Sequence, residues 1–258
     1  MENIKMHHIG CTKDDIGKYV FLPGDPGRAK LIASYFDKTE FVTSNREFTT
    51  YTGNIDDTKV SVTSTGIGGP SAAIAMEELV KLGAHTFIRV GTCGAIQKEL
   101  KPGTLVIPTA AIRKDGTSQE YIPVEFPAVA DFSLLTVLKE AAERLGHSYR
   151  MGIVECKDSY YGQHEPERMP VGHMLREKWE AWKLAGTLAS EMESSTLFVV
   201  ASVLHVRCAT VLLLYRNRER EKLLNTEAIC SDQVPDAVET AIEAMRSMII
   251  QDNRQHHG

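Results

Sequence analysis

An arginine lies inside a short apolar run, residues 87–90, and small residues follow it directly. A guanidinium is rarely buried without a partner, so Arg89 either pairs with a structural carboxylate or binds an anion. Thr92 and the glycines beside it would add a hydroxyl and backbone N–H groups, which together suit an anion with several oxygens. From this stretch alone both interpretations remain open.

A second strand, turn and helix pattern lies nearer the N-terminus. Residues 18–23 predict a strand, Gly24 opens a turn, and Arg28 falls in the first turn of the helix that follows. A helix that starts after a glycine turn can bind an anion at its N-terminus. The lysine and spacing of a P-loop are missing, so Gly24 and its neighbours could also be plain turn residues.

The segment Gly66–Ser71 comes close to the dinucleotide-binding fingerprint but does not match it. Ser71 stands where the third glycine belongs, and no acidic residue ends a second strand about 20 residues further on. We therefore do not expect a nicotinamide cofactor.

Two carboxylates, Glu191 and Glu193, precede an apolar helix predicted at residues 195–204. Residues at i and i+2 face one site only if the backbone is non-helical or enters a helix there. Otherwise one carboxylate caps the helix and the other is solvated. The polar, proline-bearing segment 160–170 is either a substrate loop or a solvated one, and the charged tract 216–222 is most simply a solvated loop.

The elements that would position these residues alternate between strands and helices. Further strands are predicted near residues 60–65, 103–108, 151–156 and 208–214, with helices near 71–82, 134–145 and 235–250 and a surface loop at 109–130. This alternation predicts one α/β domain over residues 1–258, a three-layer α/β/α fold around a central mixed sheet. The glycines and arginines follow strand ends, where open α/β sheets bind their ligands.

Composition narrows the classes of function. The chain has 258 residues, 24% charged residues and a net charge of −5, which is typical of a soluble globular protein and disfavours broad binding to nucleic acid or membranes. No apolar run approaches the roughly 18 residues of a membrane span, and the first residues have no signal-peptide pattern. The five cysteines include no C-x-x-C pair, which suits a reducing cytoplasm and gives no zinc site.

In their order along the chain, these segments resemble the nucleoside phosphorylase family, of the hexameric type that includes the bacterial uridine phosphorylases. The matching stretches are His8–Gly10, Gly24–Arg28, Arg46–Phe48, Ser64–Ser71, Arg89–Thr92, Glu125–Asp131 and Glu191–Glu193. The resemblance implies a phosphorylase fold and the reversible phosphorolysis of uridine to uracil and ribose 1-phosphate, through an oxocarbenium-like transition state. Such catalysis is mostly positioning and electrostatics.

The resemblance also implies a role for each matching residue. Phosphate would contact Gly24, Arg28, Arg46, Arg89 and Thr92. Ribose would contact His8, Glu191, Met192 and Glu193, with His8 and Arg46 donated by a partner subunit in a hexamer of three dimers. The catalytic residues would be Arg89, Glu193 and Gln163. We expect Arg89→Ala to raise the phosphate requirement steeply and to leave folding largely intact.

The base site departs from the family pattern. Purine-cleaving relatives have an Asp after the strand that ends near residue 214, and this chain has Tyr215-Arg216-Asn217 there, which favours a pyrimidine. Gln163 and Tyr160 match the residues that read uracil. The family pattern is Gly-Gln-x-Arg, but this chain has Glu at position 165 in place of the Arg. Either Arg168 reaches the base through a differently shaped loop, or Gln163 acts alone. Arg216 falls at a base-pocket position, where it could also fill the pocket.

Two further expectations follow from the resemblance. Glu47, the Ile67 carbonyl and Ser71 match positions that bind a monovalent cation, which we expect to be potassium; an ordinary polar cluster is the alternative. The alternative functions are a purine nucleoside phosphorylase or a nucleosidase of the same family, and a non-catalytic nucleoside sensor.

Overall fold

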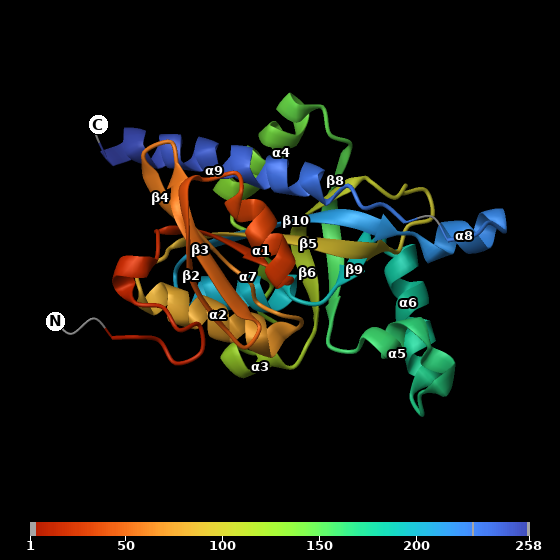
Figure 1. The fold of residues 1–258 in the computed structure, drawn as a ribbon. Helices are drawn as coiled ribbons and strands as arrows, with labels where there is room; N and C mark the ends of the chain where they lie inside the picture. Colours follow the sequence, from red (N-terminus) through yellow and green to blue (C-terminus); the bar gives the residue numbers. More distant parts are fainter. Residues whose placement is uncertain (1–3, 229, 257–258) are drawn as a thin grey trace.

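The computed structural model describes residues 4–228 and 230–256, and within them ten strands form one mixed sheet (Figure 1). The strands are β1 (Tyr19–Pro23), β2 (Asp37–Asn45), β3 (Phe48–Ile55), β4 (Thr58–Thr63), β5 (Thr86–Ala95), β6 (Leu105–Lys114), β7 (Ala128–Val129), β8 (Tyr149–Lys157), β9 (Ala189–Glu191) and β10 (Arg207–Arg216). The prediction of an α/β fold with a central mixed sheet is confirmed.

Half of the sheet closes on itself. β10 pairs with β6, β6 with β8, β8 with β9, and β9 with β5, which returns to β10. The parallel strands β1 and β4, and then the antiparallel strands β3 and β2, extend the sheet from β5. The closed half includes β5, which carries Arg89, and β9, which carries Glu191.

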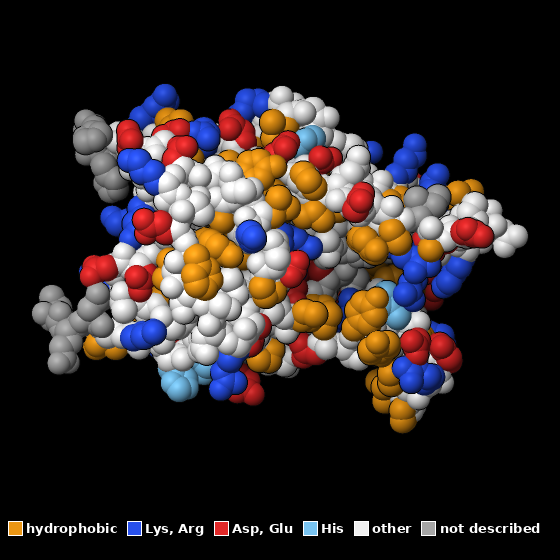
Figure 2. Space-filling view, viewed as in Figure 1, with side chains coloured by type: hydrophobic (Ala, Val, Ile, Leu, Met, Phe, Trp, Pro, Cys, Tyr) orange, Lys and Arg blue, Asp and Glu red, His pale blue; other side chains and the backbone are white. Residues whose placement is uncertain are grey.

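Helices cover the sheet on two sides. They are α1 (Pro26–Ala33), α2 (Gly69–Lys81), α3 (Thr117–Tyr121), α4 (Phe132–Leu145), α5 (Tyr160–His164), α6 (Gly172–Leu184), α7 (Ser194–Val203), α8 (Arg218–Leu224) and α9 (Val234–His256). Figure 1 shows α4 and α9 together on one side and α2, α3 and α7 on the other. α5, α6 and α8 project from one end, and Figure 2 shows that the surface is hollowed between this projection and the body.

Helix ends agree with the sequence patterns. Asp25 caps α1 by accepting a hydrogen bond from Gly27 N, and Asp131 caps α4 by accepting one from Leu134 N. Gly146 ends α4 in the left-handed conformation at φ 74°, which a glycine adopts without the cost that a Cβ brings.

Several boundaries differ from the expected ones. β5 does not end at Val90 but continues to Ala95, because β10 and β9 supply ladder partners for its glycines. The expected surface loop at 109–130 is wrong: β6 runs to Lys114, α3 follows, and β7 pairs back onto β6. β2 and α6 were not anticipated.

The two polar segments are also more regular than expected. Residues 160–164 form helix α5, followed by a 3-10 turn at Pro166–Arg168. The tract after Arg216 forms helix α8, because the Asn217 side chain accepts a hydrogen bond from Arg220 N and so caps it. None of the helices in the described ranges is long and apolar enough to cross a bilayer.

Candidate active site

The centre of the candidate site is Arg89, which is buried in β5 between two carboxylates. Its Nε donates to Glu191 Oε2 at 3.2 Å, and its Nη2 donates to Glu193 Oε2 at 2.5 Å. A charge-assisted pair in a buried site is strong and directional. Arg89 therefore pairs with carboxylates, as the first interpretation predicts. The second interpretation, anion binding, requires that an anion contact Arg89 next to these carboxylates.

The short junction between β9 and α7 brings both carboxylates to Arg89. Glu191 ends β9, and its carboxylate accepts from the backbone N–H groups of Glu193 at 3.0 Å and Ser194 at 2.9 Å. Glu193 also accepts from Gly68 N at 2.6 Å. Glu191 thus pairs the N–H of Ser194, the first residue of α7, and also binds Arg89. The alternative of one solvated carboxylate is wrong, since both are buried.

One arginine does not neutralise two buried carboxylates. Burial lowers the pKa of Arg89, but Glu193 and Glu191 together raise it by more, so Arg89 keeps its charge. Burial, and then the negative charge of Glu191, raise the pKa of Glu193 in spite of the opposing charge of Arg89. Among the described residues the Nη1 of Arg89 is buried without a hydrogen-bond partner. A buried donor without a partner is rare in proteins, so this nitrogen is a candidate contact for an oxygen of a ligand.

A second guanidinium adjoins the first. Arg28, at the start of α1, donates from Nη1 to the Val90 carbonyl at 3.4 Å. Burial, and next the charge of Arg89, lower the pKa of Arg28 below its usual value. Two neighbouring cations repel unless an anion lies between them. The position of Arg28 therefore favours the anion-binding interpretation.

Close packing of small residues makes room for these arginines. A Cβ on Gly91 would lie 2.7 Å from Arg89 Nη2, so only glycine leaves the guanidinium its place. A Cβ on Gly24 would lie 3.0 Å from the Gly66 carbonyl oxygen, and Gly66 N donates to the Gly24 carbonyl at 3.0 Å. Thr92, half-buried, follows Gly91 in β5.

Next to the carboxylates lies a cluster that the sequence analysis missed. Lys157, at the end of β8, is buried, and its Nζ donates to Ser190 Oγ at 2.6 Å. Ser190 Oγ lies 2.9 Å from Gln163 Oε1 and 2.8 Å from Glu155 Oε2. Burial lowers the pKa of Lys157, and the carboxylates of Glu155 and Glu191 oppose that shift. The only signal in the sequence was a pair of charges, Glu155 and Lys157, at the end of a strand.

Helix α5, which carries Gln163, also carries Tyr160, another residue predicted to contact the base. The Tyr160 and His164 rings lie 4.3 Å apart between centroids, and Tyr160 is half-exposed. Burial, then the charges of Arg218, Lys157 and Arg216, lower the pKa of His164 to about 4, so its imidazole is neutral at pH 7. His164 is another residue that the sequence analysis missed.

The two arginines proposed for the base differ in position. Arg216 lies near Tyr160 and His164 and makes a bidentate pair with Glu221, with Nε and Nη2 at 2.9 and 2.8 Å from its oxygens. Arg168 is exposed, binds Glu165 Oε2 at 2.5 Å and lies over the Tyr161 ring. Arg168 is thus turned toward its own loop.

The N-terminal segment and the β2–β3 turn carry the residues expected to serve a partner subunit. The buried Glu78 carboxylate accepts from His8 N and Ile9 N and lies 2.7 Å from His8 Nδ1, which fixes the imidazole. Arg46 is exposed in the turn, with φ 54°. Neither contacts the Arg89 cluster of its own chain in the described contacts.

Two of the three residues expected to hold a cation, Glu47 and Ser71, are in contact. Ser71 Oγ donates to Glu47 Oε1 at 2.6 Å and also contacts the Thr65 carbonyl oxygen. The pKa of Glu47 is lowered, mainly by the hydrogen bond from Ser71, so the group stays a carboxylate. Ile67 is exposed one residue after Gly66. Carboxylate, hydroxyl and carbonyl oxygens fit a hard cation.

Comparison with known proteins assigns the family. A model of the phosphorylase superfamily matches residues 18–249. The chain belongs to this superfamily. The uridine phosphorylase of Treponema pallidum is 52% identical to this phosphorylase over 247 residues, covering 96% of this chain and 95% of its own. The uridine phosphorylase of Escherichia coli is 38% identical over 254 residues, 96% of this chain and 100% of its own.

A relative with another name is also similar to this phosphorylase. The guanosine phosphorylase of Halorubrum lacusprofundi is 35% identical over 240 residues, which cover 92% of this chain and 95% of the relative. Membership of the superfamily therefore does not by itself decide between pyrimidine and purine. The base must be assigned from the residues around Gln163.

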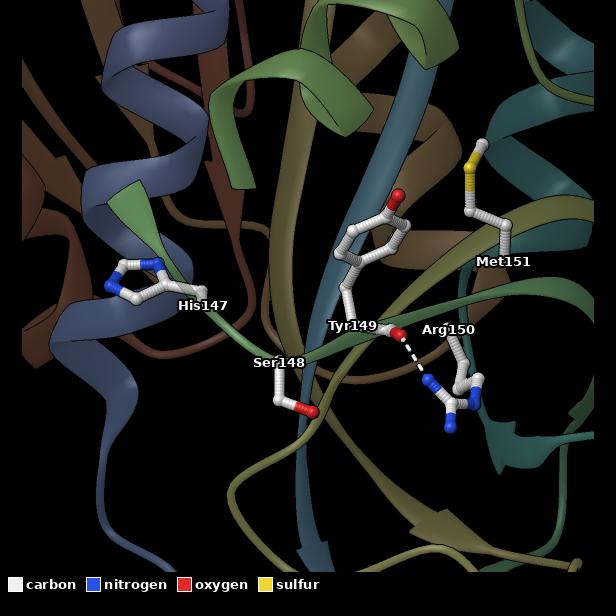
Figure 3. A pocket seen from close by; sticks show the side chains of 5 residues that line it. All are labelled: His147, Ser148, Tyr149, Arg150 and Met151. Atoms are coloured by element: carbon white, nitrogen blue, oxygen red, sulfur yellow. Dashed lines mark hydrogen bonds between the residues drawn. The ribbon is translucent and has the colours of Figure 1, made fainter. Parts of the chain in front are cut away.

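A pocket at the start of β8 lies apart from this site. It is lined by His147, Ser148, Tyr149, Arg150 and Met151 (Figure 3). Arg150 donates to the Tyr149 carbonyl at 2.9 Å, and His147 Nδ1 lies 3.0 Å from Thr240 Oγ1 on α9. These contacts are local, and none of them reaches Arg89, Glu193 or Gln163. The pocket is therefore no part of the phosphorylase site.

Proposed function

We propose that this phosphorylase is a pentosyltransferase, a uridine phosphorylase that converts uridine and phosphate reversibly to uracil and ribose 1-phosphate. The observation that carries this proposal is the environment of Arg89: its buried Nη1 has no hydrogen-bond partner in the part of the chain that the structure describes, while its other nitrogens bind Glu191 and Glu193. A buried guanidinium that has one nitrogen left to pair, and carboxylates on its other nitrogens, suits a phosphate next to a sugar. The names of the most similar relatives reported above support the same reaction.

The phosphate side would act by holding the nucleophile in place. Phosphate would bind Arg89, Arg28, Thr92 and the Gly24 backbone below the ribose ring. As the bond from C1′ to the uracil N1 breaks, positive charge develops on the sugar, and the bound anion stabilises it. A phosphate oxygen then forms the new bond to C1′. Fixing the anion in advance lowers the entropic and electrostatic cost of this step.

The sugar would lie between phosphate and base, over the β9–α7 junction. Glu193 would accept hydrogen bonds from the ribose hydroxyls, with Met192 against the ring and Glu191 holding Arg89. Because Glu193 is fixed by Arg89 and Gly68 N, its carboxylate needs little rearrangement on binding.

The base side would accept the electron pair that uracil takes from the broken bond. Gln163 would read the base edge, Tyr160 would pack on its face, and the buried Lys157 ammonium would stabilise charge on a carbonyl oxygen. A purine would need an acid at its N7, and the position after β10 where purine-cleaving relatives have an Asp is Asn217 here, whose side chain donates to the Gln97 and Leu100 carbonyls and accepts from Arg220 N. A pyrimidine needs no such acid.

The deciding experiment measures free base released from uridine and from inosine, each with and without phosphate. We expect uracil release that depends on phosphate, and little hypoxanthine. Hypoxanthine release would favour a purine nucleoside phosphorylase, in line with the guanosine phosphorylase relative. Release without phosphate would indicate a nucleosidase, and uridine binding without turnover would indicate a sensor.

We also propose a homohexamer of three dimers, in which His8 and Arg46 complete the site of the neighbouring subunit. The exposure of Arg46 and the rigid attachment of His8 to Glu78 support this arrangement. If it holds, inactive Arg46→Ala and Glu193→Gln chains should complement each other, since a mixed dimer contains one intact site. We expect the co-refolded mixture to regain about a quarter of wild-type activity, as half of the dimers are mixed. Activity that stays at the level of the separate variants would contradict the shared site.

We further propose that Glu47, Ser71 and the Ile67 carbonyl hold a potassium ion, which would contribute fixed positive charge that ties the β2–β3 turn to the start of α2. At constant ionic strength, replacing sodium by potassium should then raise Tm by about 2–4 °C, equivalent to about 1 kcal/mol of binding free energy. Ser71→Ala should abolish the difference between the two salts. An equal Tm in both salts for the wild-type protein would rule out the site.

A further inference from the structure

The amide of Gln163 can present either its oxygen or its nitrogen to a ligand, and the residues behind it decide which. We propose that Ser190 and Glu155 are positioning residues that turn the Gln163 nitrogen toward Ser190 and its oxygen toward the base. This deepens, and rests on, the proposed uridine phosphorylase activity. It assigns selection against cytosine to two buried side chains that do not touch the substrate.

The hydroxyl of Ser190 determines this orientation, because it has a single proton. Ser190 Oγ has three neighbours: Lys157 Nζ at 2.6 Å, Glu155 Oε2 at 2.8 Å and the Gln163 amide oxygen at 2.9 Å. The hydroxyl has one proton to donate and two lone pairs that accept. The ammonium of Lys157 fills one lone pair. The carboxylate of Glu155 can only accept, so it takes the single proton.

One lone pair of Ser190 then remains, and it faces Gln163. An amide oxygen placed there would oppose another oxygen with no proton between them. A half-turn of the amide exchanges its oxygen and nitrogen, and the nitrogen then donates to the free lone pair. With this orientation every donor and acceptor on Ser190 is paired. In a buried cluster an unpaired acceptor is costly, so the orientation is firmly set.

The opposite end of the amide would then face the base as an acceptor. Uracil carries a proton on N3, which Gln163 Oε1 can accept. Cytosine has a lone pair at N3, which the same oxygen would repel. Selection between the two bases would thus be made by the Glu155 carboxylate, through Ser190, over two hydrogen bonds.

Glu155 also offers a way to reverse the orientation. Lys114 Nζ lies 3.3 Å from Glu155 Oε1, on the far side from Ser190. In the variant Glu155→Gln, Lys114 retains the oxygen of the new amide, and the nitrogen of that amide points to Ser190. The two lone pairs of Ser190 are then filled by Lys157 and by this introduced nitrogen, so the hydroxyl proton turns to Gln163 Oε1. The Gln163 nitrogen would then face the base.

The test compares three variants by two ratios. These are kcat/KM for uridine over cytidine, and the inhibition constants of cytosine over uracil, measured with saturating phosphate. We expect Ser190→Ala to lower both ratios, because Gln163 can then turn freely, and Glu155→Gln to lower them further, by about tenfold or more. Ser195→Ala removes a buried hydroxyl that binds Asp115 and does not contact Gln163, and should leave both ratios unchanged.

Each outcome decides the proposal. Lower ratios in the order stated support it. Unchanged ratios in Ser190→Ala and Glu155→Gln, or equal losses toward both bases, overturn it and leave the two residues with a structural role. Inhibition constants can be measured without fast turnover, so a folded variant with low activity still gives the ratio for cytosine over uracil. If the wild-type protein does not cleave uridine, the proposed function fails, and this is seen before any variant is compared.

Discussion

Arg89→Ala is expected to lose both activity and stability, whereas the sequence alone suggested that folding would survive. The guanidinium is the cation that Glu191 and Glu193 share, and its removal leaves two buried carboxylates facing each other. Breaking a buried pair by removing one partner costs about 3–5 kcal/mol. The same change removes the cation opposite the bound phosphate, and we expect kcat/KM for phosphate to fall by about 100-fold or more.

Urea unfolding and phosphate kinetics on the same variants would measure both effects. Arg28→Ala is the matched control, because Arg28 is half-buried and its one described hydrogen bond goes to a backbone carbonyl. It should raise the KM for phosphate and leave the unfolding midpoint close to that of the wild type. Arg89→Ala with wild-type stability would mean that the two carboxylates do not depend on this cation.

Lys157→Met is expected to reduce kcat by about 100- to 1000-fold, the range seen when one donor to a developing negative charge is removed. The ammonium is buried, so no solvent screens its charge from the departing base. Methionine has a similar volume but carries no charge and has no N–H group to donate. The measurement is kcat for uridine with saturating phosphate, and the control is Lys114→Met, which removes the other lysine near Glu155 from a more exposed position.

The pH profile gives an independent check on Lys157. Because burial lowers its pKa below the usual value of 10.5, kcat should decline with rising pH earlier than a free lysine would require. Between the two pKa values the unfolded chain binds one more proton than the folded chain, so the free energy of unfolding from this group rises with pH there. Loss of activity and gain in stability should therefore coincide. An alkaline decline that persists unchanged in Lys157→Arg would assign it to another group.

The sequence was most informative where local patterns carry chemistry. The turn before Arg28, the strand around Arg89 and the helix entry after Glu193 could all be located, because glycines, strand ends and helix caps are local signals. The longer β5 and β6 could not, since their last residues are strands only through partners that lie far along the chain. Helix α8 was hidden because a charged tract has no apolar face to reveal it.

The cluster of Glu155, Lys157, Gln163 and Ser190 could not have been found from residue spacing. Glu155 and Ser190 become neighbours because β8 and β9 pair in parallel at that register, 35 residues apart in sequence. Gln163 then reaches Ser190 from a helix that the sequence did not predict. Such contacts depend on strand register, which the sequence of one strand alone does not fix.

The closed half of the sheet depends on the three-residue strand β9. It joins β5 to β8 and carries Ser190 and Glu191, so the ring of strands and the proposed ribose and base sites share one short segment. Local unfolding of β9 would disrupt both proposed sites at once. The start of β5 would stay paired with β1 and β10, and Arg28 would keep its place next to it. In amide hydrogen exchange, the protection of β9 should therefore report directly on whether a molecule is competent for catalysis.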